Sequence, residues 1–574
     1  MPRHRSIVAV TLAWLVVLLG CAAPATPTAA PLSQGGGNAP VAQQPTGPKK
    51  IVAIIRGDPH TLINKLTAAG TSQFSGGDDL QDLVAAGLTQ RDDRNALIPQ
   101  IAEAVPSTEN GLWVVNADGT MVTTWKIKAN AIWQDGGPIT SDDVVFTAEV
   151  GRDKGLPILN EVAYNSVQSI EAPDPRTIVV RWKQPFIDAD ALFSSRASLP
   201  IPRHLLEDAY AGDKSTFLQN PYWSQQYIGS GPFRVKEWQY DTSLTLVAND
   251  DYILGRPKID EIDIRFVGDV NAIIANVLAG SGEMTIGRAI SLEQARQAAD
   301  AWQTGHADFR ISGGLVVYPQ FMNPTPDIVT NVAFRRALMY GVDRQSIADS
   351  LTHGLTTKSD SFLSTDYPGY DKIEPGIVKY AYDPRQSAQL MEGLGYAKGP
   401  DGLYRGANGQ PLAVEIRVSD GDDLNKQATL SAADFWKQSG IEVDPSIIPQ
   451  QRATDREYSA TFPGLFLNRQ VSDLRNMGNY RSAGTPLPSN NFTGQNRNRY
   501  VDPALDALID KYFVTIPIDQ RLGVVRDFLH TMTDQLLLLS MFYSEDASLV
   551  SNRLQNVSNK HTNLAWNAHL WDIQ

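Results

Sequence analysis

The sequence has almost no cysteine. Its 574 residues contain a single one, Cys21, so a disulfide within the chain is excluded. Positive charge is in deficit too, because 63 acidic residues face 50 basic ones and the formal net charge is -13. This balance argues against a surface that binds nucleic acid. At this length the chain is too long for one hydrophobic core, and we expect two or three lobes.

Motifs of the common catalytic centres are missing as well. The eight histidines are scattered and no HExxH occurs, which argues against a conventional zinc hydrolase. Neither GxSxG, nor a phosphate-binding P-loop, nor GxGxxG appears. We therefore predict a protein that is not an enzyme and uses no cofactor or metal. An extracellular hydrolase whose site is assembled only by folding is the weaker alternative.

Long apolar runs are missing beyond the N-terminus. There, Arg3 and Arg5 precede an apolar run at 7–19, which has the length of a signal-peptide core and is too short to cross a bilayer comfortably. The run ends in LLGC at 18–21, which resembles the bacterial lipobox. That resemblance implies cleavage before Cys21, acylation of Cys21 and anchoring of an extracytoplasmic protein to a cell membrane. A secreted protein with an incidental cysteine is the alternative.

The segment after Cys21, up to residue 48, is rich in Ala, Pro, Thr, Gly and Gln and has almost no charge. Such a composition buries too little apolar area to offset its ordering entropy. It predicts a flexible tether, with the folded part beginning near Lys49.

The most informative stretch runs from Tyr227 to Phe266. It contains a glycine turn followed by three runs in which apolar and polar residues alternate, and this pattern predicts a β-meander. Four motifs come in order: GSGPF at 229–233, EW at 237–238, NDDY at 249–252 and PKIDEI at 257–262. Together they resemble the signature of the family 5 extracellular solute-binding proteins of ABC importers, which includes oligopeptide, dipeptide and nickel receptors.

Further matches extend the resemblance from Ile51 to about Val550. They include IPQIAE at 98–103, IWQDG at 132–136, VAFRRAL at 332–338 and YVDPALDALI at 500–509. The segment Val332–Leu351 is expected to be an amphipathic helix, with Arg335 and Asp343 in structural ion pairs. Trp133 and Asp135 are also expected to be structural.

The alternation of strands and helices predicts an α/β fold. The resemblance implies a two-lobed periplasmic-binding-protein fold of type II with an additional inserted subdomain. The implied boundaries are a signal peptide at 1–20, a tether at 21–48, lobe I at 49–66, 215–311 and 533–574, the inserted subdomain at 67–214 and lobe II at 312–532.

The ligand site is expected in the cleft between the lobes. Candidates for its aromatic wall are Phe74, Tyr318, Phe321, Phe466 and Tyr480, with core packing as the alternative for each, and Asn323 ends the strand that carries two of them. Peptide-binding members carry a g-W-x-x-D segment whose aspartate pairs with the ligand's ammonium.

In this chain Leu465 stands for the tryptophan of that segment and Asn468 for the aspartate, unless Asp473 takes its place. A neutral amide cannot neutralise a buried ammonium, which disfavours a peptide with a free amino end. Arg469, Arg475 and Arg481 come next, and each is either a ligand for a carboxylate or phosphate or a surface arginine.

The resemblance implies a receptor, expected to be a monomer, that delivers a peptide-like or other medium-sized organic solute to the transmembrane subunits of an ABC permease by hinge closure. A surface sensor or adhesion module on the same scaffold, without a transport partner, is the alternative. The sequence does not identify the ligand.

Overall fold

The computed structural model describes residues 47–64, 76–156, 161–420, 422–452, 455–560 and 563–574. The predicted signal peptide, Cys21, most of the tether and Phe74 lie outside the described residues. The residues Pro48–Gln574 belong to one compact unit. None of the helices in the described ranges combines the length and apolar character that crossing a membrane requires.

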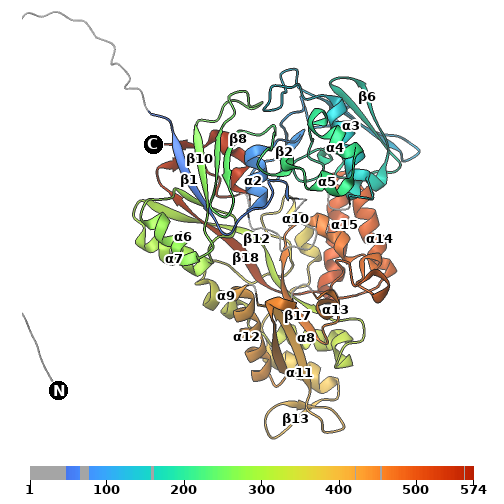
Figure 1. The fold of residues 1–574 in the computed structure, drawn as a ribbon. Helices are drawn as coiled ribbons and strands as arrows, with labels where there is room; N and C mark the ends of the chain where they lie inside the picture. Colours follow the sequence, from blue (N-terminus) through green and yellow to red (C-terminus); the bar gives the residue numbers. More distant parts are fainter. Residues whose placement is uncertain (1–46, 65–75, 157–160, 421, 453–454, 561–562) are drawn as a thin grey trace, which may run out of the picture. The chain divides into compact units, whose positions relative to one another are not determined.

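A large mixed β-sheet runs through the unit (Figure 1). Within the described residues it has ten strands, in the order β16-β15-β17-β12-β18-β11-β1-β10-β9-β8. The strands are β1 Lys50–Ile55, β8 Phe233–Gln239, β9 Ser243–Ala248, β10 Glu261–Phe266, β11 Met284–Ile286, β12 Gly305–Pro319, β15 Ala413–Ser419, β16 Glu442–Ile448, β17 Leu465–Val471 and β18 Leu539–Ser551.

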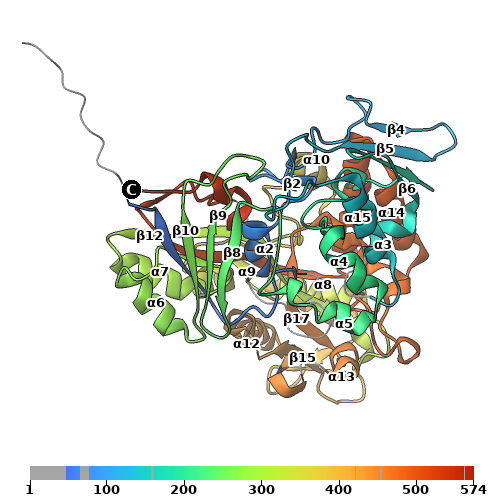
Figure 2. The ribbon, with the colours of Figure 1, turned by 45° about the horizontal axis from the view of Figure 1, so that its top comes forward.

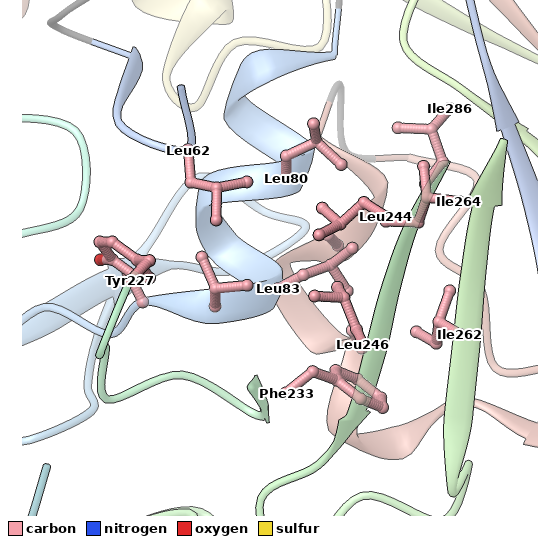
Figure 3. Close-up of a cluster of buried hydrophobic side chains, with 14 of the residues drawn as sticks. Leu62, Leu80, Leu83, Tyr227, Phe233, Leu244, Leu246, Ile262, Ile264 and Ile286 are labelled. Carbon is pink, nitrogen blue, oxygen red and sulfur yellow. The ribbon is translucent and has the colours of Figure 1, made fainter. Parts of the chain in front are cut away.

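The predicted β-meander forms one edge of this sheet, which confirms the three alternating runs. β8, β9 and β10 pair antiparallel in sequence order, and β10 then pairs parallel with β1. Because side chains alternate across a strand, Ile262 and Ile264 are fully buried while Asp263 between them is only half-buried. Figure 3 shows these isoleucines packed with Leu244, Leu246 and Phe233 against helix α2, Gly77–Val84.

The glycine turn before β8 packs directly on the C-terminal end of α2. A Cβ built on Gly231 would lie 2.3 Å from the backbone nitrogen of Ala85, so only glycine fits there. The Gly231 N–H donates to the Val84 carbonyl at 3.0 Å, and the Ala86 N–H donates to the Ser230 hydroxyl at 3.1 Å. The turn therefore fixes the meander to the helix.

The inserted segment builds a smaller antiparallel sheet of its own. Its order is β4-β5-β7-β6, with β4 Trp113–Val115, β5 Met121–Lys126, β6 Val167–Asp174 and β7 Thr177–Trp182. Figure 2 shows helix α3, Ser141–Arg152, beside this sheet, and their side chains share a hydrophobic cluster that includes Trp125, Trp133 and Trp182. The Asp118–Gly119 turn joins β4 to β5 as predicted.

Helices cover both faces of the large sheet and fill its crossovers. Near β1 and β11 lie α6 Val270–Leu278 and α7 Leu292–Ala301; α4 Arg203–Ala211 and α5 Lys214–Leu218 precede the meander. The helices between β12 and β18 are α8 Val332–Tyr340, α9 Arg344–Thr352, α10 Tyr370–Ile373, α11 Pro384–Gly393, α12 Asp423–Gln438, α13 Arg456–Ala460, α14 Pro503–Val514 and α15 Ile518–Asp534. Short two-stranded ladders pair β2 Thr89–Arg91 with β3 Leu97–Pro99, β13 Ala397–Lys398 with β14 Tyr404–Arg405, and β19 Leu554–Gln555 with β20 Asp572–Ile573.

The predicted helix over 332–351 is two helices. α8 ends at Tyr340 and α9 begins at Arg344, because Asp343 leaves the helical conformation and its carboxylate accepts from the Ser346 N–H at 3.0 Å. Arg335 is structural, but its partners are the carbonyls of Val329 and Gln535 rather than a carboxylate. The expected ion pair of Arg335 was therefore wrong, because this arginine binds backbone carbonyls instead of a carboxylate.

Trp133 and Asp135 have the structural contacts expected of them. The Trp133 side chain is buried, and its indole N–H points to the Asp143 carboxylate at 3.4 Å. The Asp135 carboxylate pairs with the His204 ring at 2.7 Å.

The two ends of the described fold meet. Lys49 forms an ion pair with Asp572, and the Lys49 N–H donates to the Asp260 carboxylate at 2.7 Å. At the last residue, the Gln574 N–H donates to the Arg553 carbonyl at 3.1 Å. β1 and the C-terminal segment are therefore held side by side (Figure 1).

Candidate functional site

Two long strands, β12 and β18, lie antiparallel at the centre of the large sheet (Figure 1). The first part of β12, Gly305–Ile311, pairs with Glu545–Ser551, and the second part lies between β17 and β18. The register shifts between Ile311 and Gly313 and again between Leu315 and Val316. Such bulges increase the local twist and re-aim side chains, and we call this part of the strand pair, around Ile311–Val316, the crossing.

The two faces of this strand pair differ in character. On one face, Phe309, Ala547 and Leu549 join a hydrophobic cluster with residues of α6 and α7. On the other face, Val550 joins the cluster beneath α2, but the positions nearer the crossing carry Ser548, Asp546 and Arg310. A polar strip therefore replaces apolar residues where the strands approach the bulge.

Arg310 is the most deeply buried charge of this strip. The residue is 4% exposed, and its Nη2 donates to the Ser548 hydroxyl at 2.6 Å. Its Nε and Nη1 have no acceptor among the protein atoms that the structure describes. Burial lowers the pKa of this guanidinium, and the nearby carboxylates of Asp79, Asp308 and Asp546 act in the opposite direction.

A second arginine reaches the same place from β17. The Arg469 Nη2 donates to the Asp546 carboxylate at 2.9 Å and also to the Ser312 hydroxyl, while its Nε is buried without an acceptor in the described part of the chain. Arg288, which lies just after β11, is a third: burial lowers its pKa, Arg469 lowers it further, and Asp546 and Asp422 raise it. We call Arg288, Arg310, Arg469 and Asp546 the crossing cluster.

Two further carboxyl groups lie near these strands: Asp79 is buried and borders the crossing cluster, whereas Glu545 is half-buried and lies on the other face of β18. Asp79 of α2 accepts hydrogen bonds from the Leu564 and Ala565 N–H groups at 2.7 and 3.3 Å, and burial raises its pKa to about 7. Glu545 pairs in register with Ile311 on the opposite face, and burial raises its pKa to about 7 as well. Both groups are therefore only partly ionised at neutral pH.

The aromatic residues predicted for the cleft wall lie mainly in a core cluster. Tyr318, Phe466 and Tyr480 are 3–4% exposed, and the Tyr318 hydroxyl donates to the Gln470 side-chain oxygen at 2.7 Å. Phe321 is half-buried, with its ring 4.8 Å from that of Tyr500 and 4.7 Å from the Arg335 guanidinium. Their contact with a ligand stays a prediction.

The two asparagines of the prediction are placed differently. Asn468 is half-buried on β17, paired with Val316, and therefore shares a sheet face with Phe466 and Tyr318. Asn323 is exposed just beyond β12 and has a positive φ of 56°, which is typical of asparagine in a turn. Asn468 thus lies near the predicted aromatics, whereas the strand that was expected to reach Asn323 ends at Pro319.

Asp473, Arg475 and Arg481 are already engaged with other groups. Arg475 donates to the Asp473 carboxylate from Nε at 2.9 Å and from Nη2 at 2.6 Å. Burial alone would raise the pKa of Asp473, but Arg475 outweighs it and holds this pKa below the ordinary value. Arg481 pairs with Asp510 and lies over the Phe513 ring.

The Asp473–Arg475 pair faces the inserted segment. The Ile187 N–H donates to the Phe513 carbonyl at 3.1 Å, and Ile187 joins the cluster of Tyr480 and Phe513. Next to it, burial raises the pKa of Asp188, and Arg475 and Arg91 oppose that shift. The inserted segment is therefore in contact with the residues after β17 through both apolar and charged groups.

Sequence reasoning missed most of the crossing cluster. It singled out Arg469 but not Arg288, Arg310 or Asp546, because an isolated charge in an alternating strand is typical of a solvent-facing position. The available signal was the presence of charged residues within two long strands that also carry many buried residues, among them Arg310 in β12 and Asp546 in β18. In the described ranges, His, Cys, Asp and Glu side chains nowhere gather in threes close enough to hold a metal ion.

Comparisons with known proteins agree with this architecture. The family model for bacterial extracellular solute-binding proteins, family 5, middle part, matches residues 96–487. A Brucella ovis protein with a provisional name as an ABC transporter peptide-binding protein is 28% identical over 399 residues, covering 67% of this chain and 70% of its own. The oligopeptide-binding protein AppA of Bacillus subtilis is 24% identical over 399 residues, covering 68% of each chain.

Solved structures share the fold. The structure of Bacillus subtilis AppA in complex with a nonapeptide superposes with a TM-score of 0.71 at 19% identity, over 92% of this chain and 99% of that one. NikA from Brucella suis in complex with Fe(III)-EDTA gives a TM-score of 0.74 at 16% identity, over 92% and 100%. The predicted α/β periplasmic-binding-protein fold is thereby confirmed.

The match over more than half of the chain also settles the choice between enzyme and binding protein, because this family consists of non-enzymatic receptors. The protein belongs to the family 5 bacterial extracellular solute-binding proteins, the solute-binding components of ABC transporters.

Proposed function

We propose that this protein captures a peptide-like or other medium-sized organic solute between two lobes and delivers it to the transmembrane subunits of an ABC permease. The observation that carries the proposal is the crossing of β12 and β18. These two strands are shared by both parts of the sheet, and their bulges offer a place for hinge bending. The proposed lobes are 49–66, 215–311 and 533–574 for the first and 312–532 for the second, with 67–214 inserted.

Relatives with this fold support the solute class. AppA was solved with a nonapeptide and NikA with Fe(III)-EDTA, so the scaffold accommodates organic ligands of different shapes. We propose that Asn468 takes the place of the family's ammonium-binding aspartate, because the alternative, Asp473, is held by Arg475. We therefore propose a ligand that does not depend on a free amino end.

Ligand-dependent stabilisation tests the proposal. A solute that binds only the folded, closed protein raises its stability by RT ln(1 + [L]/Kd), which is about 2.7 kcal/mol at a hundred times Kd. Mass spectrometry of small molecules released from the purified protein identifies candidates, and a thermal-shift screen of peptides, chelates, sugars and organic acids measures them. The proposal fails if no small molecule is released and no solute raises the unfolding temperature.

We further propose that Cys21 is acylated after removal of residues 1–20 and anchors the protein to the outer face of a cell membrane. The supporting observation is the LLGC motif that ends the apolar run. The expected result is that the wild type sediments with membranes and Cys21→Ala does not. Recovery of the wild type with an unmodified Cys21 would contradict the anchor without affecting the binding function.

A further inference from the structure

We propose that Arg310 and Arg469 bind a carboxylate of the transported solute at the crossing of β12 and β18. This inference rests on the proposed function and deepens it, because it names the chemical class of the ligand and the residues that select it.

The first observation is the surplus of buried donors. Arg310 is 4% exposed and two of its nitrogens, Nε and Nη1, have no acceptor among the described protein atoms. The Arg469 Nε has none there either, although its Nη2 is bound by Asp546 and Ser312. A buried donor that lacks an acceptor costs its full desolvation penalty, so such a site favours a ligand with several acceptor lone pairs.

The second observation is the charge of the site. Arg469 has a carboxylate partner in Asp546 at 2.9 Å, whereas the Arg310 guanidinium has no carboxylate within 4 Å among the described residues and donates only to the neutral Ser548 hydroxyl. Asp79 adds only part of a negative charge at neutral pH, because burial raises its pKa to about 7. Asp308 and Asp546 act on Arg310 from beyond ion-pair distance. Arg310 is therefore a buried cation without an ion pair among the described residues, and a negative ligand group is the one it stabilises.

A carboxylate meets both requirements. It carries one negative charge and offers about four lone-pair sites on two oxygens, which is enough for the free donors of both arginines. A neutral amide offers one carbonyl oxygen and no charge. The crossing cluster should therefore distinguish an acid from the corresponding amide.

The position of the cluster links this contact to closure. Arg288 and Arg310 come from the β11–β12 side, within the proposed lobe I, whereas Arg469 comes from β17, within the proposed lobe II. A carboxylate held by Arg310 and Arg469 together is bound fully only when the two sides are close. Such a ligand has the differential affinity for the closed state that a conformational shift requires.

The experiment compares matched acids and amides. Trialanine and a pentapeptide, each as the free acid and as the C-terminal amide, and Fe(III)-EDTA as a carboxylate source that is not a peptide, are titrated against the full chain by calorimetry. We expect the wild type to bind at least one of the acids or the chelate, and to prefer an acid over its amide by about 10- to 100-fold. Whether the peptides or the chelate bind identifies the source of the carboxylate.

Substitutions assign the preference to a residue. In Arg310→Met the affinity for the acid or chelate should fall about 10- to 100-fold, to the level of the amide, while the affinity for the amide stays the same. Arg310→Lys keeps the positive charge but lacks the planar set of donors, so its affinity for the acid should lie between those of the wild type and Arg310→Met. It replaces Arg310→Met in the test if the methionine variant does not fold. Arg335→Met is the control: it removes an equally buried arginine whose donors bind backbone carbonyls, so it should lower the unfolding temperature and leave the acid preference intact.

The outcomes separate the two proposals. Equal binding of acids and amides by the wild type, or an unchanged acid preference in the Arg310 variants, overturns the carboxylate site and leaves the receptor function standing. Binding of neutral solutes alone, found in the wider screen, has the same meaning. If no solute of any class binds, the proposed function fails, and the carboxylate site fails with it.

Discussion

Substitution of Gly231 by alanine tests how the meander is fixed to helix α2. A Cβ at this position would lie 2.3 Å from the backbone nitrogen of Ala85 and from the carbonyl carbon of Val84. Carbon atoms in favourable contact are about 3.5–4.0 Å apart, so the turn or the helix end must move by more than an ångström. The movement strains the hydrogen bond from the Gly231 N–H to the Val84 carbonyl and the one from the Asn249 side chain to the Gly231 carbonyl.

The expected cost comes from these contacts. Overpacking costs about 1–3 kcal/mol, and each of the two weakened hydrogen bonds adds about 0.5–1.5 kcal/mol, so Gly231→Ala should lower the free energy of unfolding by about 2–6 kcal/mol. Urea unfolding followed by circular dichroism measures the loss. Hydrogen exchange should show faster exchange at the amides of Ala85 and Ala86.

The matched control is Gly523→Ala. Gly523 lies inside helix α15, and a Cβ there meets nothing within 4 Å. Alanine should therefore stabilise this helix by about 0.5–1 kcal/mol. The packing argument is refuted if Gly231→Ala unfolds at the same urea concentration as the wild type, or if the two alanine substitutions have equal effects.

Three further predictions concern pH, core packing and a buried hydroxyl. Because burial raises the pKa of Asp79 to about 7, the folded protein keeps a proton that the unfolded chain has already released, and its stability falls as the pH rises from about 4 to about 7. Asp79→Asn should remove about 4 kcal/mol of this fall. The prediction is contradicted if the difference in unfolding temperature between pH 5 and pH 8 is the same in Asp79→Asn as in the wild type. Phe233 is fully buried between the meander and α2 (Figure 3), so Phe233→Ala should cost about 3–5 kcal/mol in chemical unfolding, and a loss below 1 kcal/mol would show that this core is not tightly packed. Tyr318→Phe removes the 2.7 Å bond to Gln470 and should cost about 1–3 kcal/mol without changing ligand affinity; weaker ligand binding at unchanged stability would instead place Tyr318 at the cleft.

Local patterns explain why much of the fold could be predicted from the sequence. The period of two around Ile262 and Ile264 reflects a strand with one buried face, and the Asp118–Gly119 pair is a strong hairpin signal. The break between α8 and α9 was missed because Gly341 and Val342 fit an amphipathic helix as well as they fit a turn. Helix periodicity contains no information about the side-chain cap that Asp343 supplies.

The site was harder to predict because its residues meet only through long-range pairing. Arg310 donates to Ser548, which lies 238 residues later, and no local pattern reports that contact. The pairing also decides the burial of Arg310, since the same residue in an unpaired strand would be solvated. By contrast, the glycines of the signature turn were visible in the sequence, but the reason for Gly231, the approach of the Val84 carbonyl, is visible only in the fold.

The meeting of the two chain ends has a consequence for engineering. Because the Lys49–Asp572 ion pair holds the two ends together, a short linker should join them with little strain, and new termini should be tolerated in the exposed turn at Asp118–Gly119. In such a circular permutant the helices and strands would be synthesised in a different order and would still form the same fold. It would also carry a fluorescent reporter on the inserted segment, at a distance in the sequence from the residues that enclose the solute.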